Sequence, residues 1–203
     1  MKNVMLLIDY GGVLGYDHLL EQEEALAYAV GLTQAELNNR ISEKSVVGKA
    51  FRENKITEVE FWKIVSQDES IEEPYAKVLT RMWMDTYKLN PFMMNYLQKL
   101  RKKNIKVGIL TNIDIGRSEL LKKILDVDNN LDYYFPSYIF GFSKDTTQLW
   151  YLVNEQLVND CGYDNIIYVD DRAEHVLSAE IVGWTGIRYY NLDQLEKQLD
   201  LLF

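Results

Sequence analysis

The stretch Val4-Met5-Leu6-Leu7-Ile8-Asp9-Tyr10-Gly11-Gly12-Val13-Leu14 decides the fold of this chain. It begins as an apolar run and stops abruptly at an aspartate and two glycines, a pattern typical of a strand buried on both faces of a parallel sheet. Asp9 is then the first polar side chain at the carboxyl end of that strand, the edge where open α/β sheets bind ligands. Gly11 and Gly12 permit a sharp turn and a close approach of the backbone to a ligand.

Length and charge limit the classes of protein that the chain can belong to. Its 203 residues fit one domain, or one domain that carries an insertion, and suffice to bury a full core. The net charge of −9 disfavours binding to nucleic acid or to an anionic membrane. An anionic substrate would therefore need a locally positive site.

The cysteine content and the hydropathy pattern bear on the compartment. The single cysteine, Cys161, excludes an intramolecular disulfide and fits a reducing environment. The sequence shows neither the charged-then-apolar pattern of a signal peptide nor an apolar run long enough to span a bilayer. We therefore expect a cytoplasmic protein with no nucleic-acid partner and no membrane partner.

The segment 17–87 has a helical pattern throughout and contains no predicted strand. Thr33-Gln34-Ala35-Glu36 and Thr57-Glu58-Val59-Glu60 have the spacing of capping boxes at helix starts. The residues expected to face inward on two of these helices are Ala25, Leu26, Tyr28 and Ala29, and Val59, Phe61, Trp62 and Ile64. The segment is expected to be an inserted helical subdomain, hinged near Gly15 and near Asn90-Pro91.

After residue 88 the pattern alternates between strands and helices. Apolar runs predict strands over 105–112, around 138–140, over 165–170 and over 186–190, with helices between them. Such alternation predicts an α/β fold with a Rossmann-like parallel sheet and helices on both faces. We therefore assign 1–16 and 88–203 to an α/β core and 17–87 to a helical insertion.

Polar groups follow each of four predicted strands, where parallel strands bring their carboxyl ends to one edge. These groups are Asp9, Thr111 with Asn112, Lys144, and Asp170 with Asp171. Three carboxylates and a lysine at one edge suggest a divalent-metal site, because hard cations prefer oxygen ligands. The lysine and threonine would suit the oxygens of a phosphoryl group, and a carboxylate can act as a nucleophile toward phosphorus.

These stretches resemble the ordered motifs of the haloacid dehalogenase superfamily of hydrolases. Ile8-Asp9-Tyr10-Gly11-Gly12-Val13-Leu14 resembles its first motif and Leu110-Thr111-Asn112 its second. Lys144 has the position of the lysine in the third motif of the superfamily. The fourth motif is resembled by Val169-Asp170-Asp171-Arg172, with Gly183-Trp184 downstream. The segment 17–87 falls where one subfamily carries an α-helical cap, and the chain is most similar to the branch of sugar-phosphate phosphatases and epoxide-hydrolase N-terminal domains.

The resemblance implies a Mg²⁺-dependent phosphoric monoester hydrolase that acts on a small phosphorylated metabolite. It implies that Asp9 attacks phosphorus, and that Thr111, Asn112 and Lys144 bind the phosphoryl oxygens, with Thr111 and Lys144 also catalytic. It implies that Mg²⁺ is held by Asp9, the backbone carbonyl of Gly11 and Asp171, with Asp170 nearby. Such chemistry consists mainly of positioning and electrostatics.

The chain departs from the superfamily pattern at two positions. Most phosphatases of the superfamily have a second aspartate, the general acid/base, where this chain has Gly11, and a proline where Asp145 follows Lys144. Loss of a general acid typically costs about 10² to 10⁴ in rate. Two alternatives follow: a catalytically weakened binding or regulatory relative, and a metal-free 2-haloacid dehalogenase. His18 lies at the entrance of the helical segment and is interpreted as a satisfied or exposed histidine rather than a substrate contact, and His175 is expected on the helix after Asp170 and Asp171.

Overall fold

The computed structural model describes residues 4–16, 19–160 and 162–202, so the predictions for His18 and Cys161 lie outside the described residues. Its centre is a five-stranded sheet in the order β5-β4-β1-β6-β7, and every pair of neighbouring strands is parallel. The strands are β1 (Val4–Ile8), β4 (Lys106–Thr111), β5 (Tyr133–Pro136), β6 (Asn165–Asp170) and β7 (Thr185–Arg188). The predicted α/β fold with a parallel sheet is confirmed.

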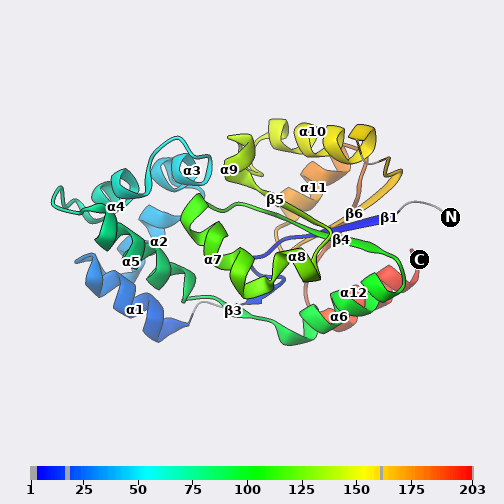
Figure 1. The fold of residues 1–203 in the computed structure, drawn as a ribbon, viewed down its shortest axis with the longest axis horizontal. Helices are drawn as coiled ribbons and strands as arrows, with labels where there is room; N and C mark the ends of the chain where they lie inside the picture. The colour runs from blue at the N-terminus through cyan, green and yellow to red at the C-terminus, as the bar shows by residue number, and fades with distance from the viewer. Residues whose placement is uncertain (1–3, 17–18, 161, 203) are drawn as a thin grey trace.

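Helices cover both faces of the sheet (Figure 1). One face carries α6 (Pro91–Lys102), α7 (Ile115–Leu125) and α12 (Leu192–Asp200), and the other carries α10 (Thr147–Glu155) and α11 (Ala173–Ile181). The side chains of β1 alternate between these layers, because successive residues of a strand point to opposite faces. Leu6 and Ile8 belong to the first apolar cluster, and Met5 and Leu7 to the second. Asp9 is thereby held at the end of a strand buried on both sides.

The helical insert consists of α1 (Leu20–Ala29), α2 (Gln34–Ile41), α3 (Val46–Arg52), α4 (Glu58–Ser66) and α5 (Glu73–Met84). The predicted capping boxes at Thr33 and Thr57 are both formed. The insert has its own apolar core, in which the rings of Phe61 and Trp83 stack at 5.6 Å and Trp62 donates to Thr80 Oγ1 at 2.9 Å. Burial of each large side chain contributes roughly 1.5–3 kcal/mol. Within the described residues, no helix has the length and apolar character needed to cross a membrane.

A short two-stranded ribbon, absent from our predictions, joins the insert to the core. Strand β2 (Gly15–Tyr16) pairs with β3 (Lys88–Leu89) in antiparallel register, and Asn90 N donates to Leu14 O at 2.8 Å. Two-residue strands carry too little periodicity to be recognised in a sequence. The ribbon ties the two chain crossings together next to Asp9, so the insert is held at the carboxyl edge of the sheet (Figure 1).

The third strand was predicted in the wrong place. Strand β5 covers Tyr133–Pro136, and the predicted segment 138–140 lies in the short helix α9 (Ser137–Phe140). Both segments are rich in aromatic residues that favour strands, and pairing with β4 selects the first of them. The predicted inward faces of two insert helices were also partly wrong, because Tyr28 is 88% exposed and Ile64 is 53% exposed.

Candidate functional site

A cavity of about 530 Å³ opens between the carboxyl edge of the sheet and the helical insert. The predicted site residues that line it are Asp9, Gly11, Thr111, Asn112, Lys144 and Asp171. Asp170 lies behind them, fully buried. The structure therefore brings together the polar residues at the ends of the four predicted strands. Of these residues, Asp170 alone does not line the cavity.

Asp9 is fixed at the end of β1 by donors on one side of its carboxylate. Its Oδ1 accepts from the backbone N–H of Tyr10 at 2.7 Å and lies 2.9 Å from Nζ of Lys144. Its own N–H donates to Val169 O at 2.9 Å, which continues the pairing of β1 with β6. Burial raises the pKa of Asp9 to about 6, although Lys144 acts in the opposite direction.

Lys144 is a buried cation between two buried carboxylates. Its Nζ lies 2.9 Å from Asp9 and 2.9 Å from Asp170. The loop between α9 and α10 that carries it is anchored by Asn112 Oδ1, which accepts from Lys144 N at 2.8 Å, and by Trp150, whose ring N–H donates to Lys144 O at 2.8 Å. Burial alone would lower the pKa of Lys144, but the two carboxylates outweigh it and raise that pKa.

Asp170 is the acceptor of the most crowded hydrogen-bond cluster in the site. Its Oδ2 lies 2.9 Å from Lys144 Nζ, 2.5 Å from the Tyr168 hydroxyl and 3.0 Å from His175 Nδ1. Its Oδ1 accepts from Arg172 N at 2.9 Å. Burial would raise the pKa of Asp170, but Lys144 and His175 overcome it and hold that pKa below its ordinary value. Asp170 is therefore an anion that fixes the position of Lys144.

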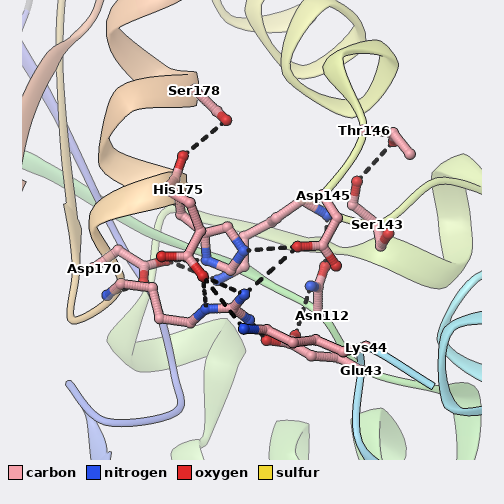
Figure 2. Close-up of polar contacts among 12 residues, drawn as sticks. Glu43, Lys44, Asn112, Ser143, Asp145, Thr146, Asp170, His175 and Ser178 are labelled. Carbon is pink, nitrogen blue, oxygen red and sulfur yellow. Dashed lines mark hydrogen bonds and ion pairs between the residues drawn. The ribbon is translucent and has the colours of Figure 1, made fainter.

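His175 lies on the helix that follows Asp170 and Asp171, as predicted, but the sequence analysis did not foresee its contacts with the site. It is 1% exposed and lies between Asp170 and Asp145, with Nε2 at 3.5 Å from Asp145 Oδ1 (Figure 2). Burial and Lys144 lower the pKa of His175, but the neighbouring carboxylates of Asp145 and Asp170 outweigh them and raise it. Its position five residues after Asp170, in the first turn of the following helix, was the signal that could have revealed it.

Tyr168 is a second residue that the sequence analysis missed. The Tyr168 hydroxyl lies 3.2 Å from Lys144 Nζ and also contacts Asp170. Burial and the charge of Asp170 raise the pKa of Tyr168 well above its ordinary value. Residues two apart on a strand share a face, so the position of this tyrosine two residues before Asp170 was the signal that could have revealed it. Tyr168 stays neutral and donates.

The carboxylates of Asp9, Asp170 and Asp171 can hold a divalent cation. Each offers an oxygen, and the three oxygens lie within 4.8 Å of one another. Gly12 has φ +71°, and a Cβ there would lie 2.6 Å from the Asp171 carboxylate, so only glycine lets the turn pass this close. An all-oxygen donor set at this spacing fits Mg²⁺. Burial, together with Asp170, raises the pKa of Asp171, a shift that a cation would reverse.

Thr111 is the last residue of β4 and Asn112 follows it; both line the cavity, but their surroundings differ. Thr111 is 4% exposed at the strand end. Asn112 has both ends of its amide engaged, because its Oδ1 holds the Lys144 loop and its Nδ2 donates to Glu43 Oε2 at 2.8 Å. In this structure Asn112 therefore joins the lysine loop to the helical insert.

Glu43 and Lys44 of the insert contact the loops of the site (Figure 2). Glu43 pairs with Arg172, the residue after Asp171, as well as with Asn112. Lys44 lies 3.9 Å from Glu174 at the start of α11. These residues are far from the site in sequence and have no motif, so only the folded chain reveals them.

Gly11 occupies an open position in the turn after Asp9. A Cβ built on Gly11 would have no atom within 4 Å, apart from its chain neighbours. The site therefore has room for a side chain at this position, and the chain provides none.

Comparison with known proteins supports the fold and shows the family. The haloacid dehalogenase-like hydrolase family matches residues 6–183. A HAD family enzyme of Bacteroides thetaiotaomicron, bt-2542, in complex with magnesium and inorganic phosphate, superposes with a TM-score of 0.75 at 18% identity, over 96% of this chain and 99% of that one. A predicted HAD-like hydrolase of Porphyromonas gingivalis gives 0.76 at 17% identity, over 100% and 98%.

A more distant neighbour has a different activity in its name. The L-2-haloacid dehalogenase of Xanthobacter autotrophicus, with chloropropionic acid covalently bound, has a TM-score of 0.64 at 13% identity, over 100% of this chain and 83% of that one. No curated protein sequence matches the chain. The family match spans the first strand, the lysine loop and the paired aspartates, and the chain therefore belongs to the haloacid dehalogenase-like hydrolases.

Proposed function

We propose that this chain is a Mg²⁺-dependent phosphatase that hydrolyses a small phosphorylated metabolite through an aspartyl-phosphate on Asp9. The observation that carries the proposal is the buried Lys144 ammonium at 2.9 Å from Asp9, beside the three carboxylates that fit a cation. A divalent cation on these carboxylates, together with the Lys144 ammonium, would place two positive groups beside Asp9, which suits a dianionic phosphoryl group better than a neutral ligand. The magnesium and phosphate of the Bacteroides enzyme support it.

The first step of the proposed reaction is phosphoryl transfer to Asp9. Oδ1 of Asp9 is held by Tyr10 N and Lys144, so the carboxylate has one orientation toward the cavity. An Asp9 oxygen forms a bond to phosphorus while the ester P–O bond breaks and its electron pair leaves with the alkoxide. Thr111 and Lys144 hydrogen-bond the phosphoryl oxygens, whose charge is spread in the transition state. The alkoxide takes a proton from water.

The second step returns Asp9 to its starting state. Water attacks phosphorus, the bond between phosphorus and Asp9 breaks, and phosphate leaves with the water's oxygen. The proton that this water releases neutralises the hydroxide left by the first step. Asp9, the carbonyl of Gly11 and Asp171 are the proposed ligands of Mg²⁺, which when bound neutralises phosphoryl charge and orients the group. Asp170 keeps Lys144 in place during both steps.

A metal-free 2-haloacid dehalogenase is the second candidate function. Gly11 favours it, because no carboxylate at this position is needed when halide leaves without a proton. The cluster of Asp9, Asp170 and Asp171 favours the phosphatase, because a metal-free reaction does not require it. A screen of metabolite phosphates and 2-haloacids, each with Mg²⁺ and with excess chelator, separates the two. Hydrolysis of phosphates only with Mg²⁺ is expected, and haloacid turnover in chelator would reject the phosphatase.

We propose further that the helical insert closes over the substrate at the Asp9 edge, and this closure predicts an effect of Glu43. Glu43→Gln removes the ion pair with Arg172 and should raise KM about two- to fivefold with little change in kcat, because a partly exposed pair is worth roughly 0.2–1 kcal/mol. Lys44→Met is the matched control, since its contact with Glu174 is exposed and long, and it should change neither constant. A fall in kcat at unchanged KM for Glu43→Gln would instead place Glu43 in the chemistry.

The affinity for Mg²⁺ is expected to fall at acid pH. The pKa of Asp9 is raised to about 6, so below this pH a proton occupies the carboxylate that the cation requires. Above it Asp9 is ionised and the affinity should level off. The dissociation constant measured by calorimetry should rise by up to about tenfold per pH unit below about pH 6. A dissociation constant that is flat across this range would contradict the assignment of Asp9 as a ligand.

A further inference from the structure

Two buried arginines lie in the same cavity as Asp9, and the reaction above uses neither. Arg52 ends α3 of the insert and Arg117 lies in the first turn of α7 of the core. They are 6% and 3% exposed. Their guanidinium carbons lie 5.1 and 3.4 Å from the centre of the Trp83 ring. Two cations from two different layers of the protein are thus held against one aromatic side chain.

The hydrogen-bonding capacity of Arg117 is not filled by the protein. Nε of Arg117 donates to Asp114 Oδ2 at 2.5 Å, but its Nη2 is buried and has no hydrogen-bond partner. Nη1 of Arg52 donates to two backbone carbonyls, those of Ile41 and Gly48. A buried donor without a partner is rare in folded proteins and costly, so Nη2 of Arg117 points to a ligand that is bound in use.

Arg117 is paired with Asp114, whereas the charge of Arg52 has no such partner in the described part of the chain. Among the residues that the structure describes, no carboxylate forms an ion pair with Arg52. Burial and the neighbouring Arg117 lower the pKa of Arg52 to about 9, which still leaves it charged at neutral pH. Glu23 also lines the cavity, but its carboxylate accepts from the amide of Gln34. In a chain with net charge −9, this positive cluster is a local exception.

We infer that Arg52 and Arg117 bind a second anionic group of the substrate, a carboxylate or a second phosphate. The inference rests on the proposed phosphatase function and narrows its substrate to phosphorylated metabolites with two anionic groups. A guanidinium donates two parallel hydrogen bonds to either anion. One anion bridges an arginine of the insert and an arginine of the core, so it binds when the insert lies on the sheet edge. A cavity of about 530 Å³ has room for such a molecule.

Matched pairs of phosphate esters test the inference by turnover. Phosphoglycerate is compared with glycerol phosphate, and fructose bisphosphate with fructose phosphate, in saturating Mg²⁺. In each pair kcat/KM for the compound with the second anion should be about tenfold or more higher, as expected for charge-assisted hydrogen bonds. Arg52→Met and Arg117→Leu should each reduce this ratio about tenfold. Arg40→Leu is the matched control, since Arg40 bonds Val65 O and is not among the cavity-lining residues, and it should preserve the ratio.

A binding measurement separates failure of the inference from failure of the phosphatase proposal. Asp9→Asn protein is titrated with phosphoglycerate and glycerol phosphate by calorimetry, where no turnover is needed. Tighter binding of phosphoglycerate that is lost in Arg117→Leu supports the second-anion site even when no ester is hydrolysed. Equal affinities for the two esters, or a preference that survives in both arginine variants, overturn it. Where the apolar variants do not fold, Arg52→Lys and Arg117→Lys keep the charge but lose the paired donors, and they should weaken the preference.

Discussion

Asp9→Asn is expected to reduce the turnover of every phosphate ester that the wild-type protein hydrolyses by roughly 10⁴-fold or more. The amide has the shape of the carboxylate but no charge, so it is a poor nucleophile and a weak ligand for Mg²⁺. The hydrogen bond from Tyr10 N to the side-chain oxygen can persist, and the fold of β1 is unaffected because its apolar residues are unchanged. Steady-state rates with and without excess chelator measure the effect.

The matched control for this substitution is Asp132→Asn. Asp132 is also largely buried and paired, with Arg101 and Lys106, but it lies beside the amino end of β4, at the opposite edge of the sheet. Its loss should lower stability and leave kcat unchanged. Hydrolysis by Asp9→Asn at the wild-type rate, or undiminished hydrolysis by the wild type in chelator, would reject the aspartyl-phosphate mechanism.

The central part of the site could be predicted because its residues follow buried strands. Asp9 and Asp170 each come directly at the end of an apolar run, and parallel strands bring such ends to one edge regardless of the helices between them. The capping boxes at Thr33 and Thr57 could also be predicted, because each joins a threonine to a glutamate only three positions later. Features that depend on neighbouring residues in the sequence can be predicted without knowledge of the tertiary structure.

The rest could not be predicted because it depends on contacts between distant segments. Segment 138–140 has strand-forming residues, yet β4 pairs with the segment before it. Glu43 reaches Asn112 across 69 positions in the sequence. Arg52 and Arg117 converge on Trp83 from separate layers, and as single residues they have the appearance of ordinary helix arginines. The prediction that Tyr28 faces inward was wrong because the apolar residues of a short helix are compatible with more than one buried face.

Gly11→Asp is expected to raise the turnover of alkyl phosphates by about 10² or more, within the usual range for a general acid/base. The substitution is sterically allowed, because no atom lies within 4 Å of the new Cβ and the backbone is outside the left-handed region. Gly11→Asn is the matched control, since it has the same size and no acid/base function. Both variants are compared at saturating Mg²⁺, so that a change in metal affinity does not enter the rates.

The effect of Gly11→Asp should depend on the leaving group. An aryl phosphate leaves as a stable phenolate that needs no proton, whereas a sugar phosphate leaves as a basic alkoxide that does. Single-turnover phosphorylation of Asp9 should therefore accelerate more with alkyl than with aryl esters. Breakdown of the aspartyl-phosphate should accelerate for both, because the water that attacks phosphorus then has a base beside it.

The alternatives make different predictions for the same pair of variants. If a residue of the helical insert already supplies the proton, Gly11→Asp will improve neither class of ester, and the wild-type protein will hydrolyse sugar phosphates efficiently. If the chain is a binding relative, neither the wild type nor Gly11→Asp will phosphorylate Asp9, although both will bind Mg²⁺ through the carboxylates around Asp171. A gain in Gly11→Asp equal to that in Gly11→Asn would show that the side chain acts by filling the open position rather than by proton transfer. The missing general acid/base belongs at position 11 only if turnover rises in Gly11→Asp but not in Gly11→Asn, and rises more for alkyl than for aryl esters.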